Sequence, residues 1–469
     1  MNEKQSTTPT IPQRYRRRRG QGLPQELHVV NPHAAGIDVG ATAHYVSVPE
    51  DRAREAVRCF GCYTPELEAM AQWLTACGIT TAVVEATGVY WIPVFRVLES
   101  HGIHVLLVNP RHVKYVPGRK SDVGDCQWLR QLHTYGLLRG AFVPSHEVAS
   151  MRTYWRQRKE LVHAASAEIQ HMQKALTQMN LQLHVVLSDI TGLSGMRILR
   201  AIVAGQRDPV ALAALAHAYV KSPRDEIAKA LTGHYTDEHL FVLQQSLDLF
   251  DFFHLKIQEC DEQLARYLDR FPSQADAAPP PPPRTRSKAT RRKNQPHFDL
   301  RGELYRLAGV DLTRIDGIDA MTAFAVLSEI GFDVSAFPTE DKFVSWLGLC
   351  PDNRITGGKV KRRTTRHVFN RAADALRVAA QSLWRSKSYL GACYRRFQAR
   401  HGAPKAITAT AHKLARIIYR LLKHGDEYVD KGQHHLEQQH RQRSLKSLVK
   451  HAKELGYTLI DTNTGECVA

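Results

Sequence analysis

The chain has 469 residues, 43% of them hydrophobic, and carries a formal net charge of +18 at pH 7. This length allows two or three domains with sizeable cores, and the positive charge favours a polyanion as partner. No apolar run approaches the roughly 18 residues of a membrane span, and the basic N-terminus lacks the apolar core of a secretion signal, so we expect no membrane partner and a cytoplasmic, nucleoid-associated protein.

Basic residues are concentrated in three segments. Residues 1–30 are polar and arginine-rich, which is typical of a disordered basic extension. A second cluster, at 284–293, follows a run of prolines, and a third lies at 359–366. The first two fit a solvated tail as well as a binding segment. The third adjoins apolar sequence and a Gly-Gly turn, so we expect it to contact phosphate directly.

Residues 34–145 alternate short apolar strands with helices. Strands are expected at about 37–39, 44–48, 57–60, 81–85 and 103–108, and helices at 65–76 and 89–100. The order of three strands, helix, strand, helix and strand is that of an RNase H-like α/β sheet. In such a sheet the first and fourth strands are neighbours.

Four carboxylates in this region suggest metal-dependent phosphodiester chemistry. Asp38 and Glu85 stand at the ends of two apolar strands, and Asp122 and Asp125 lie three residues apart at an expected helix start. Such a set repels itself unless a cation neutralises it, and Mg²⁺, with Mn²⁺ as an alternative, prefers hard oxygen ligands. A single one of these residues is more often a surface or capping residue, and a helix start itself favours Asp122 and Asp125. Lys120, beside them, is either a phosphate contact or a solvated side chain.

Residues 146–272 have the long, charged pattern of a helical coiled-coil arm. One role for this arm is spacing and oligomerisation, and the other is gripping nucleic acid through Arg152, Arg156, Arg158 and Lys159; we favour the first. Residues 273–298 form a linker rich in proline and arginine, whose proline run is stiff.

Residues 299–425 are expected to form a mainly α-helical domain. A glycine turn near Gly317 between two short helices resembles a helix–hairpin–helix, and two helices are expected at about 366–384 and 404–423. Between the turn and these two helices lies a loop, residues 352–359. The candidates for clamping the scissile phosphate or an RNA are Arg354, Lys359, Arg362 and Arg363. The remaining residues, 426–469, form a polar tail.

Several motifs in this order resemble the DEDD-type transposases of the insertion sequence 110 family. They are Gly36-Ile37-Asp38-Val39, Val84-Glu85-Ala86-Thr87-Gly88, Asn109-Pro110 followed by Lys120-Ser121-Asp122-Val123-Gly124-Asp125, Gly348-Leu349-Cys350-Pro351 and Gly357-Gly358-Lys359. The resemblance covers about residues 34–425. It implies a RuvC-like domain that holds magnesium, a coiled coil and a C-terminal transposase domain.

The resemblance also implies how such a protein works. It implies DNA excision and insertion by a homo-oligomer, a dimer or tetramer, directed by an element-encoded guide RNA that pairs with donor and target DNA. In the family a serine just before a glycine is the nucleophile, set against the carboxylates of another subunit. The matching residue here is Thr356.

Threonine at this position leaves three interpretations open. Thr356 is the working nucleophile, although its methyl group crowds an in-line approach; or the serine lies elsewhere, for example at Ser345; or this copy is impaired in strand exchange. A loop threonine that caps the following helix is the purely structural interpretation. We therefore expect a magnesium-dependent, RNA-guided DNA recombinase. The alternatives are a RuvC-like nuclease that uses water and a nucleic-acid-binding remnant without activity.

Overall fold

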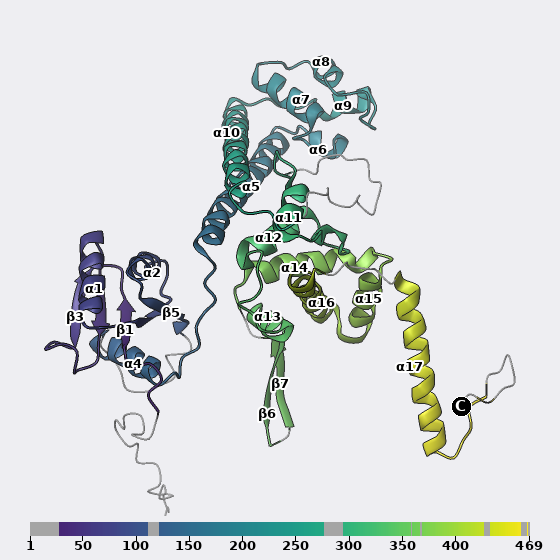
Figure 1. The fold of residues 1–469 in the computed structure, drawn as a ribbon. Helices are drawn as coiled ribbons and strands as arrows, with labels where there is room; N and C mark the ends of the chain where they lie inside the picture. The colour runs from purple at the N-terminus through teal and green to yellow at the C-terminus, as the bar shows by residue number, and fades with distance from the viewer. Residues whose placement is uncertain are drawn as a thin grey trace, which may run out of the picture. The chain divides into compact units, whose positions relative to one another are not determined.

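The computed structural model describes residues 28–110, 122–275, 294–357, 359–365, 368–425 and 432–460, together with Cys467 (Figure 1). Most of the predicted basic extension and the proline- and arginine-rich part of the predicted linker lie outside these described residues. The chain divides into two compact units, one up to Val143 and the other from Pro144 onward.

The first unit is a mixed five-stranded sheet with helices on both faces. The strands are β1 (Ala34–Val39), β2 (Ala43–Ser47), β3 (Val57–Gly61), β4 (Thr81–Glu85) and β5 (His104–Val108), and their order across the sheet is β3-β2-β1-β4-β5. β1 pairs antiparallel with β2 and parallel with β4. The predicted order of strands and helices is confirmed, as is the prediction that the first and fourth strands are neighbours.

Each face of this sheet is covered by helices because the central strands are apolar on both sides. On one face Ile37 and Val84 pack into a core with α1 (Thr64–Ala76) and α2 (Trp91–Ser100). On the other face Val83 and Val108 pack against Leu129 of α4 (Asp122–Thr134). The first unit is therefore a three-layer α/β arrangement.

The second unit begins with two long helices that pack along each other, α5 (His146–Gln178) and α10 (Asp237–Leu268). We call this pair, with the short helices between them, the arm. Those short helices are α6 (Leu183–Val186), α7 (Leu193–Val203), α8 (Pro209–Ala214) and α9 (Arg224–Ala230). They share one apolar core with α5 and α10 and gather at one end of the pair (Figure 1).

The rest of this unit is mainly helical. Its helices are α11 (Leu300–Ala308), η2 (Leu312–Arg314), α12 (Ala320–Ile330), α13 (Glu340–Trp346), α14 (Arg371–Ser382), η3 (Leu383–Arg385), α15 (Tyr389–His401), α16 (Ala403–His424) and α17 (Gly432–Glu454). Around α16 pack α13, α14 and α15. A two-stranded hairpin, β6 (Pro351–Thr356) and β7 (Lys359–Thr365), projects from this body (Figure 1).

Four details differ from the sequence-based expectations. The expected loop at 352–359 is part of the β6–β7 hairpin, and the helix expected from residue 366 begins at Arg371, after the N-cap Asn370. α15 is an additional helix between the two that were expected. The polar tail contains α17, a helix whose polar sequence has no clear apolar periodicity. Within the described ranges, no helix combines the length and apolar character needed to cross a membrane.

Candidate active site

Asp38 and Glu85 occupy equivalent places at the carboxyl ends of neighbouring parallel strands. Ile37 of β1 pairs with Val84 of β4, so Asp38 and Glu85 are each the residue that follows this pair. Residues at equivalent positions of paired strands direct their side chains to the same face of the sheet. Both side chains are half-buried. The structure thus places two of the four predicted carboxylates side by side on one face.

α4 crosses this same face in close contact with β1. A Cβ atom on Gly36 would lie 2.2 Å from the carbonyl oxygen of Cys126 and 2.4 Å from the amide nitrogen of Arg130, so only glycine allows this approach. Farther along α4, the Nε2 atom of His133 is 2.9 Å from the Oγ1 atom of Thr81, at the start of β4. α4 therefore runs antiparallel to β1 and β4, and it begins near the strand ends that carry Asp38 and Glu85.

The other two predicted carboxylates belong to the first turn of α4. The helix begins at Asp122, as predicted, and Asp125 is exposed on it. The side chain of Asp122 and the whole of Lys120 lie outside the described residues. Among the side chains that the structure describes, no three of His, Cys, Asp or Glu lie close enough together to hold a metal ion. The predicted ligands at this edge are all carboxylates, whose oxygen atoms are the kind of ligand that a hard divalent cation prefers.

A sharp turn follows Glu85 and fixes the end of its strand. The amide of Ala86 donates to the carbonyl of Val108 at 2.9 Å, and the amide of Thr87 donates back to the carbonyl of Glu85 at 2.9 Å. Gly88 has a φ of +56°, in the left-handed region that favours glycine. This turn orients Glu85 at the sheet edge.

Burial shifts the pKa values of two ionisable groups on α4, Cys126 and His133. Burial, with the nearby negative charge of Asp38, raises the pKa of the Cys126 thiol to about 12, so this thiol stays neutral. Burial, with a smaller contribution from His104, lowers the pKa of His133 to about 4, and its hydrogen bond to Thr81 marks it as a structural residue. Cys126 and His133 are therefore both neutral at pH 7.

Arg130 is a cation on α4 that the sequence-based prediction did not include. Its Nε atom donates to the Oγ atom of Ser47 on β2 at 3.2 Å, and burial lowers its pKa while Glu50 opposes that shift. Arg130 lies four residues after Cys126, on the same side of the helix. Many helical residues share such a spacing, so no signal in the sequence singles out Arg130.

Thr356 lies at the tip of the hairpin, at the end of β6. It pairs with Lys359 across a two-residue Gly-Gly turn, in which Gly357 has a φ of +57°. The Thr356 side chain is exposed. The interpretation that Thr356 caps a following helix is wrong, because the strand β7 follows it. Ser345, the alternative hydroxyl, is half-buried on α13.

The four predicted clamp residues all belong to this hairpin. The register places Arg354 opposite Arg362 and Asn353 opposite Arg363, with a one-residue shift between Arg354 and Ile355. Lys359 and the neighbouring Lys361 are exposed, whereas the side chains of Arg354, Arg362 and Arg363 lie outside the described residues. A Gly-Gly pair between two strands is a hairpin signal, and it could have identified this element from the sequence.

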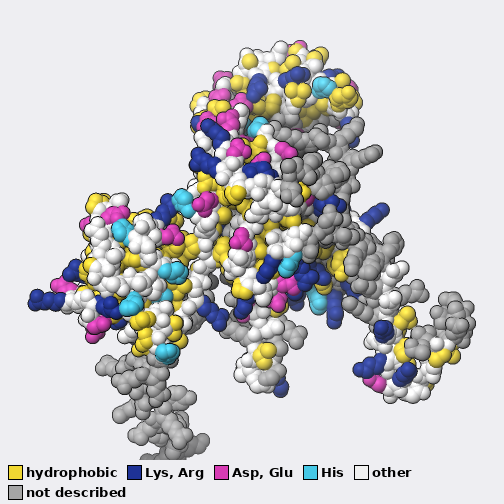
Figure 2. Space-filling view, in the orientation of Figure 1, with side chains coloured by type: hydrophobic (Ala, Val, Ile, Leu, Met, Phe, Trp, Pro, Cys, Tyr) yellow, Lys and Arg dark blue, Asp and Glu magenta, His cyan; other side chains and the backbone are white. Residues whose placement is uncertain are grey.

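Three arginines of α5 form hydrogen bonds and ion pairs with other residues of the second unit. Arg156 donates from Nη2 to both carboxylate oxygens of Glu329, at 2.9 and 2.8 Å, and Arg152 donates to the carbonyl of Glu329 at 2.6 Å. Arg158 is buried against Asp261. On the face of the arm seen in Figure 2, basic side chains lie among acidic ones. The suggestion that Arg158 grips nucleic acid is therefore wrong, and the structural role of these arginines is favoured.

Comparison with protein families gives two matches. Residues 35–181, which span the sheet unit and α5, match the DEDD IS110 model, described as a transposase. Residues 311–395, which run from the start of η2 into α15 and include the hairpin, match the transposase IS116/IS110/IS902 family. A search of curated proteins found no match.

Proposed function

Since this chain belongs to the IS110 family of transposases, we propose that it excises and inserts the DNA of an insertion sequence by cutting and rejoining strands. The observation that carries the proposal is the placement of Asp38 and Glu85. They end neighbouring parallel strands on the face that α4 crosses, and α4 begins with the segment that holds Asp122 and Asp125.

We further propose that the first unit has an RNase H-like fold of the RuvC type. Its support is the strand order β3-β2-β1-β4-β5, in which only β2 runs against the direction of the other strands of this sheet. In such a sheet, β1 and β4 are adjacent parallel strands, so the carboxylates at their C-terminal ends lie close together.

In this proposal Asp38, Glu85, Asp122 and Asp125 hold Mg²⁺, or Mn²⁺ in its place. When bound, such an ion neutralises charge that develops on the scissile phosphate. The carboxylates of this chain position that charge at the sheet edge. Without such an ion, four carboxylates at one place would repel one another.

Thr356 is the proposed nucleophile. Its hydroxyl oxygen attacks phosphorus, the phosphodiester bond breaks, and the hydroxyl proton passes to the departing deoxyribose oxygen. The resulting ester retains the energy of the phosphodiester, so a deoxyribose hydroxyl of a second strand reverses the step and rejoins DNA without an external energy source. The exposed position of Thr356 at a hairpin tip supports this role.

The hairpin also supports binding of nucleic acid. Arg354 lies opposite Arg362, and like charges directly opposite on paired strands repel each other. An anion bound between or beside them would remove this repulsion. DNA and RNA phosphates supply that anion. We propose Lys120, Arg354, Lys359, Arg362 and Arg363 as phosphate contacts. An element-encoded RNA that pairs with donor and target DNA would direct the reaction in a dimer or tetramer.

A covalent adduct tests this proposal. Purified protein is incubated with Mg²⁺, the element's RNA and end-labelled donor DNA, and the denatured products are separated. We expect label to migrate with the wild-type protein and peptide mapping to locate it on Thr356. Cut DNA without an adduct would instead indicate a nuclease that uses water, and unchanged DNA would indicate a remnant. Asp38→Asn should form no adduct, whereas Asp51→Asn, the control at an exposed carboxylate of the same unit, should form it as wild type does.

A further inference from the structure

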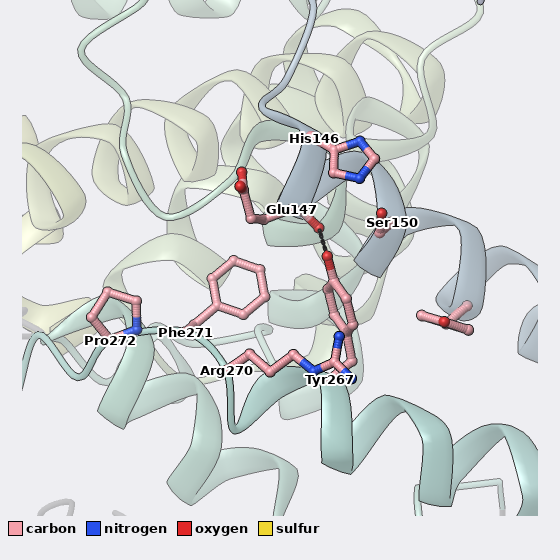
Figure 3. Close-up of a pocket in the computed structure, with 8 residues that line it drawn as sticks. His146, Glu147, Ser150, Tyr267, Arg270, Phe271 and Pro272 are labelled. Atoms are coloured by element: carbon pink, nitrogen blue, oxygen red, sulfur yellow. Dashed lines mark hydrogen bonds between the residues drawn. The ribbon is translucent and has the colours of Figure 1, made fainter. Parts of the chain in front are cut away.

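A pocket of about 430 Å³ lies where α5 begins and α10 ends, within the second unit (Figure 3). Its wall includes three aromatic residues, Tyr154, Tyr267 and Phe271, together with Arg270, His146 and Ser150. This volume is in the range of sites that bind small organic groups. No sequence motif marks the pocket, because its residues come from two distant parts of the chain that only the fold brings together.

The aromatic side chains form a continuous row. The ring centroids of Tyr154 and Tyr267 are 5.5 Å apart, and those of Tyr267 and Phe271 are 5.7 Å apart. Phe271 in turn packs edge-on against Phe332 at 5.6 Å. The hydroxyl of Tyr267 donates to the carbonyl of Glu147 at 3.2 Å, which fixes that ring (Figure 3). A ring in the middle of the row is thus fixed, while Tyr154, at one end of it, is 36% exposed.

The charges around the pocket restrict its ligand. The Arg270 guanidinium lies 5.6 Å from the centre of the Tyr267 ring. Glu147 stands in the first turn of α5, where hydrogen bonds from its own amide and from Ser145 lower the pKa of its carboxyl. A negative carboxylate at that helix start disfavours a free anion there. An uncharged planar ring, joined to a phosphate on the Arg270 side, suits both groups.

We infer that this pocket binds the base of an unpaired nucleotide, stacked on the exposed ring of Tyr154 with its phosphate near Arg270. The inference rests on the proposed function, which supplies a nucleic acid as partner. Bases of single strands stack on aromatic side chains and on arginine in many proteins, with little dependence on sequence. The unpaired nucleotide belongs either to the DNA or to the RNA, which share this chemistry.

Binding of short oligonucleotides to the full chain tests the inference. Single-stranded DNA and RNA of one sequence carry 2-aminopurine, whose fluorescence falls when it stacks. For Tyr154→Ala we expect roughly a tenfold loss of affinity and a loss of quenching, as the removal of one base stack predicts. Tyr154→Phe should retain both. Loss confined to the DNA or to the RNA identifies the source of the nucleotide.

The matched control is Tyr219→Ala, since Tyr219 is 90% exposed and lies outside the pocket. Equal affinities and equal quenching for Tyr154→Ala, Tyr219→Ala and wild type would overturn the inference. Arg270→Gln, at an exposed position, provides a second variant and should also weaken binding. None of these measurements needs strand cleavage, so a failure of the pocket is distinguishable from a failure of the recombinase proposal.

Discussion

Arg158 of α5 and Asp261 of α10 form an ion pair inside the arm, with side chains only 2% and 1% exposed. Each partner also binds the backbone at the end of the predicted linker. Arg158 donates from Nη2 to the carbonyl of Asn294 at 3.0 Å, and the amide of His297 donates to Oδ2 of Asp261 at 3.1 Å. The pair therefore joins both long helices to the start of the C-terminal part of this unit.

Removing one charge of this pair should destabilise the protein strongly. Asp261→Asn leaves the Arg158 guanidinium buried without its counter-charge, at a cost of about 3–5 kcal/mol. The exposed pair Arg200–Asp251, at 58% and 46% side-chain exposure, is the control, and Asp251→Asn should cost less than about 1 kcal/mol. Urea unfolding of both variants measures the difference. Equal, small losses would contradict the structural role of Arg158.

Gly36→Ala should disturb the carboxylate site without altering a carboxylate. The added Cβ would meet the backbone of α4 at Cys126 and Arg130, so α4 must move away from β1. We expect a loss of about 1–3 kcal/mol in stability and a loss of DNA cleavage. Gly102→Ala is the control: its Cβ has open space but a φ of +75°, so stability should fall while cleavage persists. Full cleavage by Gly36→Ala would argue against the position of α4.

Glu340 should make stability depend on acid. Hydrogen bonds from Arg420 and Arg416 lower the pKa of Glu340 from 4.5 to about 2. Because the folded pKa is depressed, this stabilisation is present above about pH 4.5 and is lost as the pH falls toward about 2. Glu340→Gln should cost on the order of 2 kcal/mol at pH 7, and its difference from wild type should shrink across that interval. Unfolding measured at pH 7, 4 and 3 checks this; a constant difference would contradict it.

The hairpin lysines should contribute to DNA affinity through phosphate. Lys359→Gln and Lys361→Gln should each weaken binding to all sequences and reduce the slope of log affinity against log salt by about 1. Lys229→Gln, an exposed lysine of α9 in the arm, is the control and should leave the slope unchanged. Titrations at several salt concentrations measure the slopes. Unchanged slopes for the hairpin variants would exclude direct phosphate contact.

The sheet can be predicted from the sequence because its strands are apolar runs separated by turns, so periodicity and order suffice. The hairpin is harder to predict because its strands are basic and lack apolar alternation, although the Gly357-Gly358 pair signals a turn. The role of Arg158 could not be predicted, because only the folded chain brings Asp261, 103 residues away, against it. Gly36 is part of a sequence motif, but its contact with α4 is a tertiary one.

In the proposed mechanism, the carboxylates and Thr356 act together in strand exchange. The yield of circular DNA junctions is the most direct test of this joint action. The yield is measured in cells that carry the complete element, with wild type, Asp38→Asn, Thr356→Ala and Thr356→Ser. We predict junctions from wild type and Thr356→Ser and none from the other two. Wild-type yield from Thr356→Ala would contradict the threonine nucleophile, and wild-type yield from Asp38→Asn would contradict the carboxylate site.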